Sequence, residues 1–120
     1  MRPRIYLSGP ITKGDRQWNF AQAAAMMHTL IACGYAVMNP MLSMALPASD
    51  AIDHATWMEN DLPWIDVADA VYRLPGESVG ADMECDYADA HGIPVYDSLA
   101  VLWAMLPTDT IAHKEASHEG

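Results

Sequence analysis

Two acidic residues of this sequence lie at helix positions where a charge is costly, and they are the first candidates for chemistry. In the predicted helix at residues 80–91, Asp82, Asp86 and Asp89 fall within about 60° of one another, at 100° per residue. Glu84 points about 160–220° away from this polar stripe, toward alanines and a tyrosine. A carboxylate on the apolar side of a helix is costly unless it is paired or used. Glu84 is therefore either a structural acid, held in a buried ion pair or by hydrogen bonds, or a catalytic one.

Asp61 is the second acid of this kind. On a helix it falls between Trp57, Trp64 and Ile65, again on the apolar side. Pro63 predicts a kink or a break in this helix. Capping of the helix at that break is the structural alternative to a catalytic role for the carboxyl group.

Small residues stand where backbone groups could bind a ligand. Ser78 and Gly80 precede the helix that carries Glu84, and the free N–H groups at a helix N-terminus bind anions. The Ser78 hydroxyl could donate to such an anion, or it could cap the helix, which is the commoner use of a serine there. Gly9 would let a ligand approach the end of the first strand, although turns of this kind are common.

Alternating strands and helices must position these residues. Short apolar segments predict strands at 4–8, 35–38, 70–74 and 93–96. Helical spacing predicts a helix from an N-cap at Asn19 to Gly34, and others at about 55–67, 80–91 and 98–106. This order predicts an α/β fold of the flavodoxin or Rossmann type, with a parallel sheet of about four to five strands and helices on both faces. Ligands of such sheets bind beyond the carboxyl ends of the strands, where loops 8–18, 39–50 and 75–80 lie.

The composition is typical of one globular domain. Of 120 residues, 52% are hydrophobic and 18% are charged, which excludes a disordered chain. We expect a domain at 1–106 and a polar C-terminal tail at 107–120. No apolar run reaches the roughly 18 residues of a membrane span and no leader opens the chain, so a cytoplasmic protein is expected.

Charge and metal-binding residue types narrow the function further. Sixteen acidic and 6 basic residues give a net charge of -10, which argues against a nucleic-acid or membrane partner. A small anion needs only a few donors, and Lys13 and Arg16 share one loop. The histidines lack metal-ligand spacing, so we expect no metal and no cofactor. Cys33 and Cys85 are interpreted as buried thiols, with a disulfide as the less favoured alternative.

Taken together, several segments resemble the nucleoside 2-deoxyribosyltransferase superfamily. They are Tyr6–Pro10, Asn39–Pro40, Asp61–Leu62 with Trp64, Ala68–Val71, Ser78 with Gly80, Ala81 and Glu84, and Gly92–Val95. Pro63 departs from the family pattern. Within it, the sequence looks closest to a small phage and bacterial domain family of uncharacterised function. It is also similar to the branch that hydrolyses 2′-deoxynucleoside 5′-monophosphates. The resemblance covers residues 4 to about 97 and implies a small nucleoside or nucleotide as the partner.

The resemblance implies roles for individual residues. Glu84 matches the family's nucleophilic glutamate, and Asp61 matches an aspartate that assists the leaving base. Tyr6 and Gly9 match residues that line the sugar pocket, and Ser78 matches the serine that binds the 5′-phosphate in the hydrolase branch. The residues expected to bind substrate are Tyr6, Ser8, Gly9, Arg16, Ser78 and Gly80.

The implied chemistry is cleavage or transfer at the N-glycosidic bond of a (deoxy)nucleoside or its 5′-monophosphate. Glu84 would be ionised and bond to the sugar, while Asp61, kept protonated by desolvation, would protonate the base. A non-catalytic nucleotide-binding module and an interaction protein with an acidic surface are the alternatives. The apolar segment Val101–Leu106, which contains Trp103, predicts a homo-oligomer, a dimer or larger.

Overall fold

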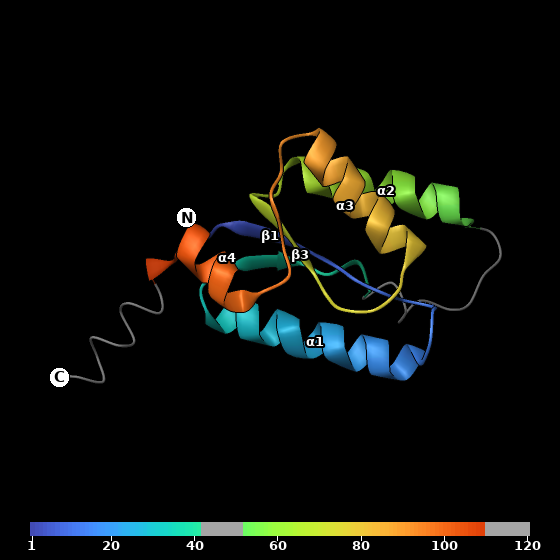
Figure 1. Cartoon of the computed structure of the whole chain (residues 1–120), viewed down its shortest axis with the longest axis horizontal. Coiled ribbons are helices and arrows are strands. Elements are labelled where there is room, and N and C mark those ends of the chain that lie inside the picture. The colour runs from blue at the N-terminus through green and yellow to red at the C-terminus, as the bar shows by residue number, and fades with distance from the viewer. Residues whose placement is uncertain (42–51, 110–120) are drawn as a thin grey trace.

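The computed structural model describes residues 1–41 and 52–109, and within them the chain forms a four-stranded parallel sheet with helices on both faces (Figure 1). The elements are β1 (Arg4–Ser8), α1 (Arg16–Ala32), β2 (Ala36–Met38), α2 (His54–Asp66), β3 (Ala70–Arg73), α3 (Val79–Ala90), β4 (Val95–Tyr96) and α4 (Leu99–Met105). The strand order is β2-β1-β3-β4, and every pair is parallel. The predicted α/β fold is confirmed.

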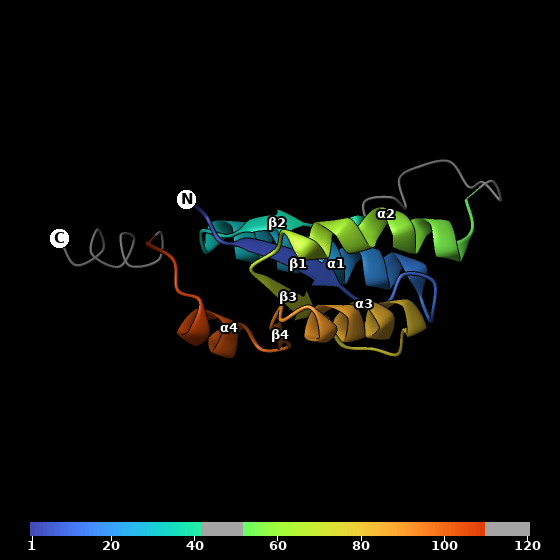
Figure 2. The same ribbon diagram turned by 90° about the horizontal axis from the view of Figure 1, so that it is seen from above.

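The alternation of side chains along β1 divides the core into two layers. Ile5 and Leu7 pack in the cluster that includes residues of α1 and α4, on one face of the sheet. Tyr6 points to the opposite face, where it packs with Ile65 of α2 and Ala88 of α3. Figures 1 and 2 show α2 and α3 together on that second face, while α1 covers the first. Residues of even number on β1 therefore face the α2–α3 pair.

Helix α1 begins earlier than the sequence pattern predicts. The side chain of Asp15 caps it by accepting a hydrogen bond from the Trp18 N–H group at 3.1 Å. Asn19, the predicted N-cap, is instead a buried residue of the first turns. Its side-chain amide donates to the carbonyl groups of Ile11 and Lys13, at 3.3 and 2.8 Å. Asp15 therefore supplies the capping acceptor of α1. The two hydrogen bonds from Asn19 hold the preceding loop against the helix.

Helix α2 runs uninterrupted through Pro63, so the predicted break does not occur. A proline removes one hydrogen bond of the helix, and burial of Met58 and Ile65 against the rest of the protein holds the helix together. Asp61 lies on this buried face as predicted. Trp64 does not, because half of its surface is exposed.

The C-terminal helix α4 belongs to the core. Leu102 is fully buried, and Trp103 and Leu106 pack against the same cluster. The Thr108 hydroxyl donates to the Cys33 carbonyl, so the chain just beyond α4 still contacts the end of α1. The remainder of the predicted tail, and most of the predicted loop 39–50, lie outside the described residues.

The described residues also answer the questions of disulfides, metal-binding groups and membrane-spanning helices. Cys33 and Cys85 are free thiols, as expected. Residues 1–41 and 52–109 hold no group of histidine, cysteine and acidic side chains placed to bind a metal ion. None of the helices in these ranges is long and apolar enough to cross a membrane.

Candidate active site

A buried carboxylate lies between the sheet and the α2–α3 pair. Glu84 of α3 is only 6% exposed. Its Oε2 atom accepts a hydrogen bond from the Tyr6 hydroxyl, and its Oε1 atom accepts one from the Ser8 hydroxyl at 2.8 Å. Each carboxylate oxygen thus has one hydroxyl donor, and both donors come from the same face of β1. The structure brings together three of the predicted site residues.

The position of Glu84 follows from the start and the packing of α3. Ser78 caps the helix, because its Oγ atom accepts a hydrogen bond from the Ala81 N–H group at 3.0 Å. Ala81 and Ala88, three residues before and four after Glu84, are buried and lie on the same side of the helix. These small side chains let α3 approach the sheet closely. The carboxyl group of Glu84 is therefore aimed at β1, and the opposite stripe of aspartates is exposed, as predicted.

Asp61 provides a second acid in the same layer. It is buried on α2, and its Oδ1 atom accepts a hydrogen bond from the side-chain amide of Asn60 at 3.1 Å. Its negative charge raises the pKa of both Glu84 and Tyr6. The two acids that the pattern placed on apolar helix faces are thus electrostatic neighbours.

Burial raises the pKa of both carboxyl groups. For Glu84, desolvation is the largest cause, and the hydroxyls of Tyr6 and Ser8 and the charge of Arg73 act against it. For Asp61, desolvation again dominates, as predicted, with the Asn60 amide opposing it. The expected ionisation of Glu84 is therefore opposed by burial, which favours the neutral form of this carboxyl group as well.

The loops that follow β1 and β3 form a closely packed rim above these residues. A side chain at Gly9 would place its Cβ atom 2.9 Å from Leu74 Cβ. At Gly76, whose φ is +115°, a Cβ atom would lie 2.9 Å from Pro10 Cγ. Leu74 fills the space that Gly9 leaves, so packing between the two loops requires a glycine at this position. This packing requirement is separate from the predicted role of Gly9 in ligand approach.

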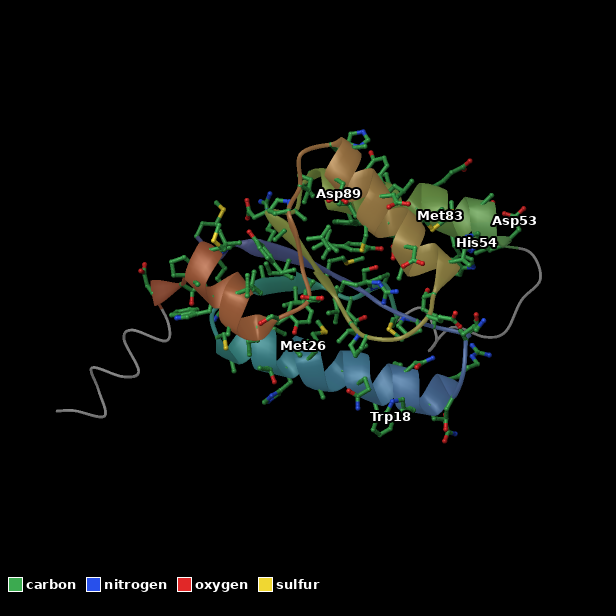
Figure 3. The ribbon with its side chains drawn as sticks, in the orientation of Figure 1. Trp18, Met26, Asp53, His54, Met83 and Asp89 are labelled. Carbon is green, nitrogen blue, oxygen red and sulfur yellow. The ribbon has the colours of Figure 1, made fainter. Side chains whose placement is uncertain are left out.

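The first turn of α3 lies beside the start of α2. Gly80 is half-buried there, and a Cβ atom at this position would lie 3.4 Å from the Cε1 atom of His54. Figure 3 shows His54 at the end of α2 that faces this turn. Two helix N-termini and an imidazole therefore border the segment that contains Ser78.

Two basic residues of the first loop region take different positions. The Lys13 ammonium forms an exposed ion pair with the Glu77 carboxylate at 3.4 Å. Glu77 directly precedes Ser78 in the chain. Arg16 is the exposed first residue of α1. Near it, Trp18 projects from α1 with 63% of its surface exposed (Figure 3). A hollow of about 130 Å³ is lined by Pro10, Trp18, Asn19, Gln22, Leu74 and Pro75.

Arg73 is a charged neighbour of the site that the sequence interpretation did not single out. It ends β3, directly opposite Ser8 of β1, and its side chain is 16% exposed. The guanidinium group donates to the carbonyl of the next residue, to the Gly76 carbonyl at 2.9 Å and to Asp82 at 3.2 Å. The strand pattern could have indicated its side of the sheet, because Arg73 lies two residues after Val71 and alternate residues of a strand face the same side. Val71 faces the α2–α3 pair.

The sequence matches a known family of domains, and the fold is similar to that of solved structures. A family model described as "Domain of unknown function (DUF4406)" matches residues 3–97. A comparison with curated proteins gives no match. Among solved structures, a 2-deoxyribosyltransferase from Bacillus psychrosaccharolyticus is 22% identical, with a TM-score of 0.60, over 77% of this chain and 69% of that one.

Two further solved structures are similar. A conserved protein from Enterococcus faecalis V583 is 23% identical, with a TM-score of 0.62, over 79% of this chain and 62% of that one. A 2-desoxiribosyltransferase from Leishmania mexicana is 19% identical, with a TM-score of 0.57, over 78% of this chain and 61% of that one. The chain therefore spans less than two thirds of the length of these two proteins. At such identities the likeness establishes a shared fold.

Proposed function

The chain belongs to the DUF4406 family of domains, and from this premise we propose that it acts on the N-glycosidic bond of a (deoxy)nucleoside or of its 5′-monophosphate. It either hydrolyses this bond or transfers the sugar to another base. The observation that carries the proposal is the buried carboxylate of Glu84, with one hydroxyl donor on each oxygen and a second buried acid, Asp61, nearby. The fold shared with 2-deoxyribosyltransferases supports the same chemistry.

The reaction proceeds in two steps that use both acids. A Glu84 oxygen bonds to C1′ of the sugar while the C1′–N bond breaks and its electron pair leaves with the base. Asp61 donates its proton to the departing base nitrogen. In the second step, water or another base attacks C1′ and Asp61 takes back a proton from it. The bond between C1′ and Glu84 then breaks, which restores the carboxylate.

Tyr6 and Ser8 prepare Glu84 for both steps. Their hydroxyl groups fix the carboxylate orientation before the sugar binds, and burial together with the charge of Glu84 raises the pKa of Tyr6, which keeps its proton in place. The same donors stabilise the carboxylate when it leaves C1′. A module that only bound nucleotides would gain nothing from a buried acid beside an anionic ligand, which favours the catalytic function over that alternative.

The preferred substrate in this proposal is a 5′-monophosphate. The Ser78 oxygen accepts from the Ala81 N–H group, so its own proton remains to be donated to a phosphate oxygen. Glu84 lies six positions after Ser78, about 9 Å along the helix axis, which is comparable with the reach of a sugar phosphate. The helix dipole adds positive potential to this end, and the Lys13 ammonium lies nearby in its ion pair with Glu77.

Incubation with a panel of nucleosides, deoxynucleosides and their 5′-monophosphates tests the proposal. Free base is measured by chromatography, with and without a second base in the mixture. Release in water alone identifies a hydrolase, and exchange that requires the second base identifies a transferase. Glu84→Gln should release no base, whereas the exposed Asp86→Asn change on the same helix should leave release intact. Ligand binding by calorimetry without any base release would instead support a binding module.

A further inference from the structure

Arg73 brings a positive charge to the layer that holds Glu84. We propose that Arg73 is a positioning residue of this site, whose guanidinium group, fixed at the end of β3, keeps the buried Glu84 carboxylate ionised. The effect of Arg73 on turnover rests on the proposed function. The electrostatic effect on the carboxyl group itself is measurable without a substrate.

The sheet register places Arg73 on the correct face. It pairs with Ser8 across neighbouring parallel strands, which lie about 4.8 Å apart. Ser8 is the residue whose hydroxyl donates to Glu84 at 2.8 Å. Since paired residues of adjacent strands project to the same side, the Arg73 side chain leaves the sheet beside the Ser8–Glu84 hydrogen bond.

The partners of the guanidinium group fix its position without cancelling its charge. Two of them are backbone carbonyl groups of the following loop, one being that of Gly76 at 2.9 Å. The third is the carboxylate of Asp82, whose side chain is 71% exposed. Water screens the charge of Asp82, whereas the Arg73 side chain is only 16% exposed. The positive charge of Arg73 therefore lowers the pKa of Glu84 despite the ion pair with Asp82.

Within the described residues, the other titratable groups that act on Glu84 supply no positive charge, although the Tyr6 and Ser8 hydroxyls also lower its pKa. Tyr6 of β1 is a neutral donor, Asp61 of α2 carries negative charge, and Cys85 of α3 is a thiol whose pKa burial raises. Among the groups acting on Glu84 in the described part of the chain, Arg73 is the cation, and its charge lowers the pKa that desolvation raises. Without that charge, the balance at Glu84 would shift toward its neutral form, which is a weaker nucleophile than the carboxylate.

A titration by NMR tests the inference directly. The protein is labelled with glutamate carrying ¹³C at the carboxyl carbon, and the Glu84 signal is assigned by its loss in Glu84→Gln. In Arg73→Gln the pKa of Glu84 should rise. In Asp82→Asn, which removes the anion paired with the guanidinium group, it should fall or stay the same. An unchanged pKa in Arg73→Gln would overturn the inference, and so would equal rises in both variants, because these would point to loop anchoring.

Two controls keep the result interpretable. Circular dichroism checks the fold of each variant, and Arg73→Lys, which restores a positive charge, should reverse at least part of the shift. If Arg73→Gln does not fold, a rise of the Glu84 pKa in Asp82→Asn overturns the inference and a fall supports it. A wild-type protein that releases no base contradicts the proposed function but leaves this titration unaffected. If base is released, the acid limb of kcat/KM should move to higher pH in Arg73→Gln.

Discussion

Tyr6 and Glu84 are joined by a hydrogen bond although 78 positions separate them in the chain. Tyr6 lies on β1, which pairs with a strand on each side, and its side chain is 1% exposed. The hydroxyl group that orients the carboxylate is therefore held by the centre of the sheet, where the backbone has least freedom to move. The candidate nucleophile is positioned by the core of the fold.

Removal of this hydroxyl should weaken catalysis more than it weakens the fold. In Tyr6→Phe, base release should fall by about tenfold to a hundredfold, because the carboxylate is no longer held in one orientation. The pKa of Glu84 should also rise, since the hydrogen bond from Tyr6 lowers it, so the acid limb of the pH–rate profile should move to higher pH. Tyr72→Phe, a buried tyrosine on the opposite face of the sheet, is the matched control. Equal losses in both variants would contradict the prediction.

The stability of the protein should depend on pH through Glu84. Its ordinary pKa of 4.5 is raised in the folded state, so the folded protein holds this proton to higher pH than the unfolded chain. The stability that Glu84 contributes is full below pH 4.5 and is lost as the pH rises through the folded-state pKa. Glu84→Gln cannot ionise, so its Tm minus that of the wild type should increase from pH 4 toward pH 7 in thermal melts. A constant difference would contradict the raised pKa.

Asp61 should matter most when the leaving base is poor. In Asp61→Asn, release of a poor leaving base should fall by about a hundredfold to ten-thousandfold, because general acid catalysis contributes most when the base leaves reluctantly. A base that leaves readily should be affected much less. Rates for a series of substrates with bases of graded basicity check this. Equal losses across the series would make Asp61 a structural residue of α2.

The phosphate preference is tested at Ser78 with the helix cap preserved. Ser78→Asp keeps a capping acceptor for the Ala81 N–H group but repels a phosphate, so the Tm should hardly change. Binding of the 5′-monophosphate should weaken at least about tenfold, while binding of the nucleoside should not change. Calorimetric titration of both ligands into both proteins measures this. If both ligands weaken equally, or if the wild type binds the nucleoside as tightly as the monophosphate, the phosphate site is wrong.

The protein should form a homodimer or a larger oligomer. Leu102 of α4 is used in its own core, but Val101 and Met105 are 49% and 65% exposed on the same helix. Light scattering at micromolar concentration should give at least twice the mass of the chain. Val101→Lys combined with Met105→Lys should dissociate it, whereas Val67→Lys, at a similarly exposed site directly after α2, should not. A wild-type monomer would refute the prediction.

Several elements were predictable because their signals are local. The strand β1 has the predicted bounds, since a short apolar segment there ends at Gly9 and Pro10. The burial of Glu84 and the exposure of the aspartates opposite it follow from the 3.6-residue period of α3. The start of α1 was misplaced because Asp15 and Asn19 both have capping side chains, and the local sequence does not decide between them.

The sequence by itself determined which side of α3 is buried, because side-chain periodicity is a property of one element at a time. Only the tertiary structure decided which other elements this side meets. The order β2-β1-β3-β4 sets Ser8 beside Arg73, and the packing of α3 on that face brings Glu84 to Ser8. A lone arginine at a strand end is ordinary in sequence, and it gains significance here from a carboxylate that comes from a later helix. Such contacts between distant segments depend on how elements pack together, which no local pattern encodes.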